Sequence, residues 1–425
     1  MSKIKHITIE KIWGIKTIST DFDENVNIFI GSNGSSKTTF LSLIEAVLLC
    51  DIKVLSSIDF ERIIIELTSS FCHYLKVSKT LGREGFNIIY QFDDEKKITI
   101  PHVNLYHIAT RTWYLRNKEP QTAVLEKLRE VVNISWLSVN RGNVPNYWDV
   151  DRRELVERIQ SSVDCKLEEL ERSLVMYQLQ LEAEANKQAV SFKEKVFSLM
   201  LYNENYDIYN TEYFRRFTES DLALMKNELF KAFKALGIVD DKKEAIFQHI
   251  DKIKSVIDKM RNGDQIDLTD VFILSLIHRT LSIIDISEAH EKITKQIFLP
   301  ITKFWDNLKK FMPQKEFYLD TDEEKLKVYL THGKEKVAID ITSLSSGEKQ
   351  LFILMAEAVL QRENPYLFIA DEPELSLHIE WQQMVLGALM SLNPEAQIIV
   401  ATHSPEIASN YPDKIKNMAN ITEYE

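Results

Sequence analysis

A glycine-containing loop near the N-terminus carries the residue types that bind phosphate. Its members are Gly31, Ser32, Asn33, Gly34, Ser35, Ser36, Lys37, Thr38 and Thr39. An apolar run at residues 28–30 precedes the loop, and apolar residues at helical spacing follow it from Leu41. Backbone N–H groups at a helix N-terminus point at a bound anion, and the helix dipole favours negative charge. The pattern therefore predicts a strand, a phosphate loop and a helix, with Lys37 at the β- and γ-phosphates of a nucleotide and Thr38 at a Mg²⁺ ion.

One position departs from the G-x-x-x-x-G-K-[ST] pattern of phosphate loops, because Ser36 stands where the second glycine is expected. A β-carbon there costs little if φ is negative, and about 1–2 kcal/mol if the residue must be left-handed. An ordinary turn rich in serine and glycine is the alternative for this loop alone. Motifs roughly 300 residues downstream argue against that alternative.

The first downstream motif covers residues 344–350 and reads Leu-Ser-Ser-Gly-Glu-Lys-Gln. An apolar helical run follows it. By itself the motif also fits an ordinary capped helix, with Ser345 or Ser346 as the N-cap and Glu348 in the first turn.

Two apolar strands come next, and each ends in polar residues. Residues 366–370 lead to Asp371 and Glu372, and residues 397–401 lead to His403. Hydrolysis of a magnesium nucleotide needs a metal ligand, a base and a group that contacts the γ-phosphate. The order predicts that Asp371 holds the metal through water or Thr38, that Glu372 polarises the attacking water, and that His403 contacts the γ-phosphate.

These motifs together resemble those of an ABC-type ATPase of the SMC, RecF and OLD-like branch. They correspond to the Walker A motif at residues 31–39, the signature at 344–350, the Walker B motif at 367–372 and the switch His403. The resemblance implies an α/β fold: an ABC-ATPase head with a P-loop α/β core and an antiparallel β layer, interrupted by an α-helical, coiled-coil-like insert. It also implies ATP and Mg²⁺ as cofactors, and a homodimer or higher homo-oligomer in which Ser345, Ser346 and Gly347 act on a neighbour's nucleotide.

Three residues depart from the pattern of this class. Ser36 replaces a glycine, Ser346 replaces the first glycine of the signature, and Glu348 replaces its glutamine. The last change is common in SMC-like members, whereas Ser36 puts the rate of turnover in doubt.

The stretch from Asp371 to His378 is similar to that of OLD-type ATPases of bacteria and phage. Those proteins often carry a C-terminal Toprim nuclease, but only 22 residues follow His403 here, so we expect none. The chain then resembles the ATPase subunits of two-gene antiphage systems such as PARIS and Septu. That resemblance implies a separate effector nuclease of Toprim or HNH type and a phage protein as trigger. The alternatives are a RecF- or SMC-like ATPase of DNA maintenance, and an ATP-switched regulator of metabolism.

Three domains are expected, at residues 1–145, 146–300 and 301–425. The first should hold a hairpin at residues 3–20, further strands between 63 and 103, and a strand from 134 whose end places Asn140 or Arg141 near the nucleotide. The second lacks proline and glycine between Pro145 and Gly237, and its apolar spacing indicates long helices. A helical arm and a compact helical subdomain both fit it. We expect the α/β pattern to return after Pro300.

Composition narrows the class of protein. The 425 residues include 44% hydrophobic ones and carry a net charge of −12, with no basic block, so we expect any binding to DNA to be weak. No apolar run reaches the roughly 18–20 residues of a membrane span, and no secretion signal precedes the first motif, so a cytoplasmic protein is expected. The three cysteines are widely separated and fit neither a disulfide framework nor a metal cluster.

Overall fold

The computed structural model describes residues 2–69, 71–81, 85–103, 111–132, 134–138, 162–199, 201, 219–237, 243–321, 323, 325–333 and 335–424. These residues form two compact units. The first combines Met1–Met176 with Ile301–Glu425, and the second is Tyr177–Pro300. Both ends of the chain therefore build one unit. The predicted domain boundary near residue 145 lies outside the described residues, as do Asn140 and Arg141.

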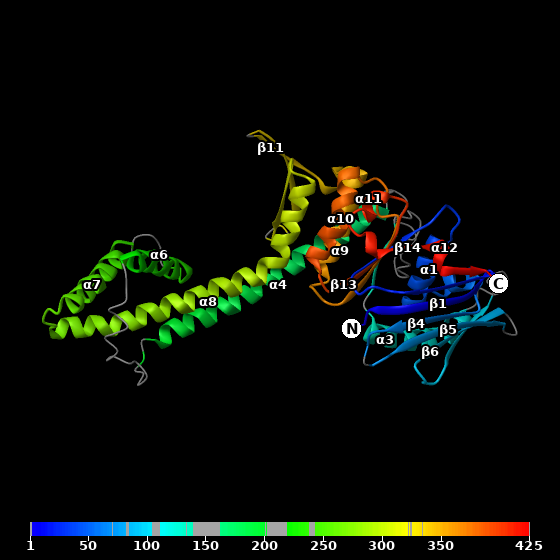
Figure 1. The fold of residues 1–425 in the computed structure, drawn as a ribbon, viewed down its shortest axis with the longest axis horizontal. Helices are drawn as coiled ribbons and strands as arrows, with labels where there is room; N and C mark the ends of the chain where they lie inside the picture. The colour runs from blue at the N-terminus through cyan, green and yellow to red at the C-terminus, as the bar shows by residue number, and fades with distance from the viewer. Residues whose placement is uncertain are drawn as a thin grey trace. The chain divides into compact units, whose positions relative to one another are not determined.

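An antiparallel sheet of seven strands forms one layer of the first unit (Figure 1). Its spatial order is β15-β2-β1-β4-β5-β6-β7. The strands are β1 (Ile4–Ile12), β2 (Lys16–Asp21), β4 (Arg62–Leu67), β5 (Tyr74–Leu81), β6 (Gly85–Phe92), β7 (Ile98–Val103) and β15 (Thr422–Tyr424). Alternate residues of β1, such as Ile7 and Ile9, are fully buried on one face, as period-two alternation predicts. The expected hairpin at residues 3–20 is confirmed as β1 and β2.

A second sheet has five parallel strands in the order β14-β3-β13-β12-β8. Its strands are β3 (Val26–Ile30), β8 (Ile134–Ser138), β12 (Tyr366–Asp371), β13 (Ala396–Ala401) and β14 (Ile415–Asn417). All six residues of β13 are buried, which is typical of a parallel strand covered on both faces. Because β3, β13 and β12 are adjacent and parallel, the loops that follow them leave the same edge of the sheet.

Helix α1 (Lys37–Leu48) lies between the two sheets. It packs on β12 and β13, and Tyr90 of β6 donates a hydrogen bond from its hydroxyl to the Val47 carbonyl at 3.1 Å. Eight of the twelve residues of α1 are buried, because both sides of the helix face a sheet. One hydrophobic core thus joins α1 to both layers.

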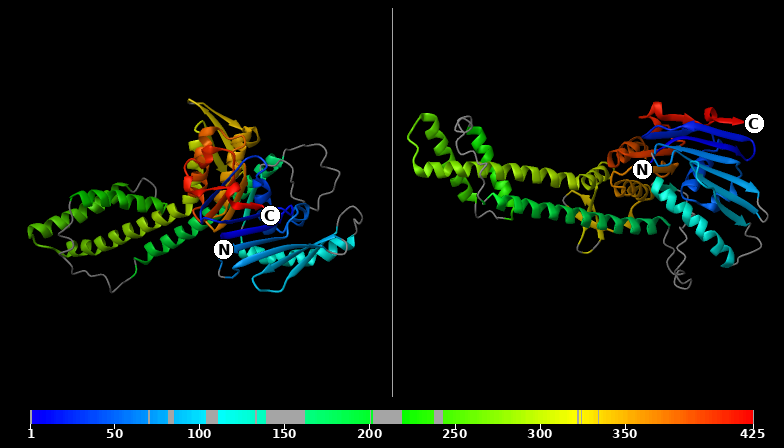
Figure 2. Two further views of the ribbon diagram at one scale, coloured as in Figure 1. Left: turned by 45° about the vertical axis from the view of Figure 1, so that its right-hand side comes forward. Right: turned by 90° about the horizontal axis from the view of Figure 1, so that it is seen from below.

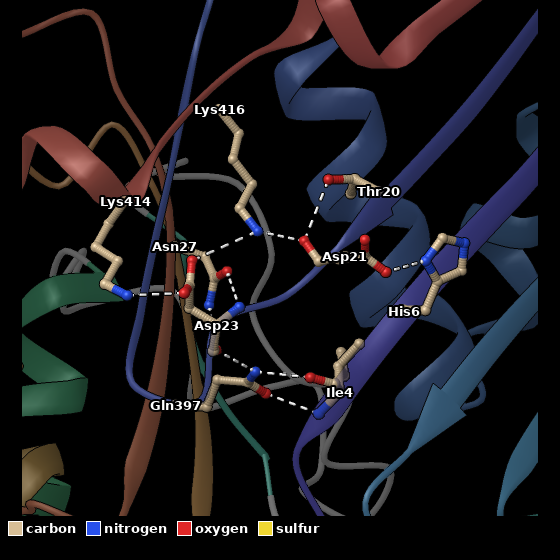
Figure 3. A network of polar contacts seen from close by, with 9 residues as sticks. All are labelled: Ile4, His6, Thr20, Asp21, Asp23, Asn27, Gln397, Lys414 and Lys416. Carbon is tan, nitrogen blue, oxygen red and sulfur yellow. Dashed lines mark hydrogen bonds and ion pairs between the residues drawn. The ribbon is translucent and has the colours of Figure 1, made fainter.

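Gln397 connects the two sheets at the start of β13 (Figure 3). Its side-chain oxygen accepts from the Ile4 backbone N–H at 2.7 Å, and its amide donates to the carbonyls of Ile4 and Asp23, each at 2.8 Å. Asn27 of β3 continues the network by bonding the Asp23 backbone twice. Gln397 is fully buried, and its two bonds to Ile4 satisfy backbone groups that are buried as well.

The remaining elements of the first unit lie around the two sheets. They are α2 (Ile52–Ser57), α3 (Arg111–Val131), α9 (Ser346–Leu360), α10 (Ile379–Leu392), α11 (Pro405–Ala408), α12 (Met418–Ile421), the short helices η2 (Ile341–Ser343) and η3 (Pro412–Lys414), and the antiparallel strands β9 (Lys315–Asp320), β10 (Lys325–His332) and β11 (Glu335–Ile339). An α/β core with an antiparallel β layer matches the predicted fold class.

The second unit consists of helices, as predicted. These are parts of α4 (Ser162–Ser198) and α8 (Leu268–Phe311), with α6 (Glu219–Ala235) and α7 (Lys243–Asn262). Within this unit α4 and α8 run side by side in Figures 1 and 2, and Phe192 stacks on His290 at 4.7 Å between ring centroids. Buried residues of α6, α7 and α8 form a separate core that includes Leu229, Ile250 and Ile277. The helical insert is therefore confirmed.

We expected the α/β pattern to return after Pro300, but it returns only after Phe311, because α8 continues through the proline to that residue. Proline removes one helical hydrogen bond. Beyond it, Ile301, Phe304 and Leu308 recur at helical spacing and are 0–4% exposed, so burial of this face maintains the helix.

Candidate functional site

The predicted phosphate loop lies between β3 and α1. Lys37 is the first residue of α1 and is only 5% exposed. Its ammonium donates to the backbone carbonyls of Gly31 at 2.8 Å and Ser32 at 3.3 Å, so the side chain folds back across the loop. This places a positive charge where the helix N-terminus also favours an anion.

Ser36 adopts the left-handed conformation that the consensus glycine would adopt, with φ of 73°. A residue with a β-carbon is strained there by about 1–2 kcal/mol. Gly31 also leaves little room for a side chain, because a β-carbon at that position would lie 2.6 Å from Ser35 Oγ and 3.3 Å from Met418 Cβ, so these neighbours would have to shift. The loop therefore keeps a phosphate-loop backbone despite the substitution at Ser36.

Carboxylates from the end of β12 face this loop. The Thr38 hydroxyl hydrogen-bonds Asp371, while Asp371 Oδ1 is buried without a partner among the described residues. Burial raises the pKa of Asp371, and the Thr38 hydrogen bond opposes that rise. A buried carboxylate oxygen without a partner is costly, whereas oxygen ligands from a carboxylate and a hydroxyl suit Mg²⁺. The residues present therefore fit the cation that the sequence predicts.

Glu372 and His403 come from the ends of adjacent strands. Glu372 has φ of 50°, and its backbone N–H donates to the Ala401 carbonyl at 2.8 Å, which joins the ends of β12 and β13. His403 Nε2 lies 3.8 Å from Glu372 Oε1, and the two side chains are 39% and 35% exposed. Both side chains can therefore reach a bound molecule.

Glu374 is a site residue to which the sequence analysis assigned no role. Its Oε1 accepts hydrogen bonds from Thr402 Oγ1 at 2.6 Å, the His403 N–H at 2.8 Å and the Ser404 N–H at 3.2 Å. Its Oε2 is buried with no partner in the described part of the chain. Glu374 thus fixes the loop that carries His403. The sequence offered one indication of this role, because Glu374 lies three residues after Asp371 in the acidic motif.

The charges of the site act on Lys37. Burial lowers the pKa of Lys37, and the carboxylates of Glu372, Asp371 and Glu374 act in the opposite direction. This coupling shows that the lysine and the carboxylates share one electrostatic environment, although they lie more than 330 residues apart in the sequence.

The predicted signature forms the N-terminus of α9. Ser345 caps the helix, and both bonds of a capping box join it to Glu348, so the N-cap interpretation is confirmed. Ser345 and Ser346 are exposed, whereas Gly347 is buried. A β-carbon at Gly347 would lie 2.2 Å from the Ser376 carbonyl oxygen, so only glycine fits this position without movement.

A family model for the AAA ATPase domain matches residues 2–408. The chain belongs to the AAA ATPase domain family. This membership agrees with the predicted ABC-type ATPase, and it covers the helical insert as well as both halves of the head.

Among curated proteins, this family member is similar to two ATPases named for retrons. The Retron Vc95 probable ATPase of Vibrio cholerae serotype O1 biovar El Tor is 30% identical over 26% of this chain and 24% of its own length. The Retron Ec83 probable ATPase of Escherichia coli is 33% identical over 17% of this chain and 16% of its own length. The matches thus cover less than a quarter of these relatives.

Among solved structures, the Smc head domain of Pyrococcus furiosus, which has an extended coiled coil, aligns with 96% of this AAA ATPase chain and 92% of its own. The identity is 14% and the TM-score 0.44, too distant a likeness to carry an argument. No helix among the described residues is long and apolar enough to cross a membrane.

Proposed function

We propose that this AAA ATPase binds and hydrolyses ATP at the edge of the parallel sheet where β3, β13 and β12 end. The observation that carries the proposal is the convergence of Lys37, the Thr38–Asp371 pair and the Glu372–His403 pair at that edge. Lysine, metal ligands and a base are the groups that phosphoryl transfer to water requires.

Each residue has a distinct task. Lys37 leaves its two backbone carbonyls and binds the β- and γ-phosphates, where the amides at the start of α1 assist it. Glu372 accepts a proton from the attacking water, and His403 donates to the γ-phosphate. Thr38 and Asp371 would hold Mg²⁺, which neutralises phosphate charge when bound.

Two substitutions separate binding from chemistry. Lys37→Ala should abolish ATP binding, because it removes the principal phosphate charge. Glu372→Gln should retain binding and slow hydrolysis by 100-fold or more, because only the base is lost. Equal turnover in wild type and Glu372→Gln would remove Glu372 from this role.

We further propose that a second copy of the chain completes the nucleotide site. Ser345 and Ser346 are exposed at a helix N-terminus, a position suited to an anion, and the Ser345 hydroxyl keeps its own proton to donate while it accepts from Glu348. Mixed complexes of Ser346→Arg subunits with Lys37→Ala subunits should recover part of the activity that each variant lacks. No recovery in a complex shown to be mixed would contradict a composite site.

The nucleotide-driven oligomer acts as a sensor and scaffold in antiphage defence, holding an effector nuclease and releasing it on infection. Support comes from the net charge of −12 and from two relatives that are named as probable ATPases of retrons. The alternative is a DNA-maintenance ATPase of the RecF or SMC kind, which the helical insert between the halves of the head also fits.

DNA affinity and phage challenge distinguish the two functions. A scaffold should co-purify with the product of an adjacent gene and bind DNA so weakly that binding is lost by about 0.15–0.2 M salt. Deletion of the gene should make cells more sensitive to phage. Tight, salt-resistant DNA binding by the isolated protein, with no partner and no effect on phage, would support the maintenance function instead.

A further inference from the structure

A second cation reaches the phosphate loop from the antiparallel sheet. Lys16 is the first residue of β2, directly after the turn of the β1–β2 hairpin. Its ammonium donates to Ser36 Oγ at 3.2 Å, although the two residues belong to different layers of the head. Ser36 is the residue that replaces the consensus glycine, so this contact exists only because of the substitution.

Two aromatic rings hold the Lys16 side chain in place. Its ammonium lies 5.3 Å from the centroid of the Trp13 ring and 5.5 Å from that of Tyr424. Tyr424 pairs with Lys16 across β15 and β2, and the side chain is half-buried. Cations within about 6 Å of an aromatic ring are attracted to its face. The ammonium is therefore oriented before any ligand binds.

No carboxylate of the described residues forms an ion pair with Lys16. Lys16 therefore lacks a counter-ion among the described residues, although the chain has 64 acidic and only 52 basic residues. Of its three N–H donors, Ser36 takes one. The Ser36 hydroxyl accepts from Lys16 and keeps its own proton to donate, so the pair presents several donors at the phosphate loop.

We propose that Lys16 and Ser36 together form a second phosphate-binding element of the nucleotide site, in which Ser36 positions Lys16 on the phosphate chain. The inference rests on the proposed function, because it requires a nucleoside triphosphate in the loop. It also gives Ser36 a role: the hydroxyl that accompanies its strained conformation anchors an additional positive charge.

The test is the affinity of the full-length Lys16→Met protein for ATP and for inorganic tripolyphosphate, both measured by competition against a fluorescent ATP analogue. Methionine keeps the stem of the side chain and removes its charge. A charge-assisted hydrogen bond corresponds to an approximately 10- to 100-fold change in affinity. Lys16→Met should weaken ATP and tripolyphosphate by the same factor within that range, because tripolyphosphate has no base or ribose.

Lys11→Met is the matched control. Lys11 lies on the same hairpin, pairs with Glu61 at 2.8 Å and has a 46% exposed side chain. This variant should bind both ligands within twofold of wild type. Ser36→Gly restores the consensus loop but removes the anchor, so the effect of Lys16→Met should be several-fold smaller in a Ser36→Gly background.

Two results would overturn the inference in protein shown to be folded by circular dichroism. One is an affinity of Lys16→Met for ATP within twofold of wild type. The other is weaker ATP binding with unchanged tripolyphosphate binding, which would place Lys16 at the base or ribose. The variant Lys37→Ala distinguishes a failure of this inference from a failure of the proposed function. If Lys37→Ala still binds ATP as the wild type does, the phosphate loop is not the nucleotide site.

Discussion

Gly347 offers a sharp test of how the signature is built, because its constraint lies within its own chain. A β-carbon at Gly347 would meet the Ser376 carbonyl oxygen at 2.2 Å, at least 0.8 Å closer than such contacts occur. Ser376 has φ of 72°, so its backbone is already in a strained region and has little freedom to retreat. We therefore expect Gly347→Ala to destabilise the isolated protein, before any partner subunit is considered.

The magnitude follows from the size of the overlap. Forcing an extra methyl group into a well-packed site costs about 1–3 kcal/mol. For a unit of about 300 residues that loss lowers the melting temperature by roughly 2–5 °C. Displacement of Ser376 would also disturb Glu374, two residues before it, and hence the loop at Thr402 and His403. ATP hydrolysis should fall together with stability.

Thermal unfolding monitored by circular dichroism, without nucleotide, measures this effect. Gly387→Ala is the control, because Gly387 lies in α10 and a β-carbon there would meet only Tyr411 Oη, at an ordinary 3.7 Å. That variant should be as stable as wild type or slightly more stable, since alanine favours a helix. A melting temperature of Gly347→Ala within 1 °C of wild type would refute the reasoning and leave the glycine to be explained by contacts between subunits.

Three further predictions concern single side chains. Burial and the charge of Asp51 raise the pKa of Glu45 from 4.5 to about 8, so the stability of the wild-type protein should fall as the pH rises from 4.5 to 8. Glu45→Gln should therefore raise the melting temperature more at pH 8.5 than at pH 5. An equal gain at both pH values would contradict this. Gln397→Leu leaves the buried N–H and carbonyl of Ile4 without their side-chain partner, whereas the Asp23 carbonyl keeps its bond from Asn27. The substitution should cost about 2 kcal/mol or more in urea unfolding, while the exposed control Gln383→Leu should stay within about 0.5 kcal/mol. Glu374→Gln should lower ATP turnover with little loss of ATP affinity, because it weakens the hydrogen bonds that hold the loop at His403. A large loss of ATP affinity would instead assign Glu374 to nucleotide binding.

Local patterns were sufficient to predict most of the elements that carry the site. The apolar runs that end at Ile30, Asp371 and Ala401 became strands, and the helix after Lys37 became α1, because each is set by short-range periodicity. The order of the motifs along the chain, together with the resemblance to ABC-type ATPases, then indicated the fold class.

Features that depend on distant pairing could not be predicted in the same way. Sequence could not decide whether Ser36 is left-handed, because the substituted loop allows either sign of φ. The contact of Lys16 with Ser36 depends on the turn of one hairpin and on a strand that pairs with it from the other end of the chain. The role of Gln397 likewise depends on how two sheets meet, and no periodicity in the sequence describes that joint.

The strand order of the parallel sheet has a consequence for biosynthesis. Both neighbours of β3, namely β13 and β14, lie more than 365 residues later in the chain. At typical rates of translation, roughly 20–75 s separate the synthesis of β3 from that of its partners. Most of the antiparallel layer pairs locally and can form early, whereas the nascent phosphate loop has no sheet to support it. Translation must therefore reach β14 before the sheet that supports the phosphate loop is complete, and during that interval the apolar β3 segment has no strand to pair with in this sheet.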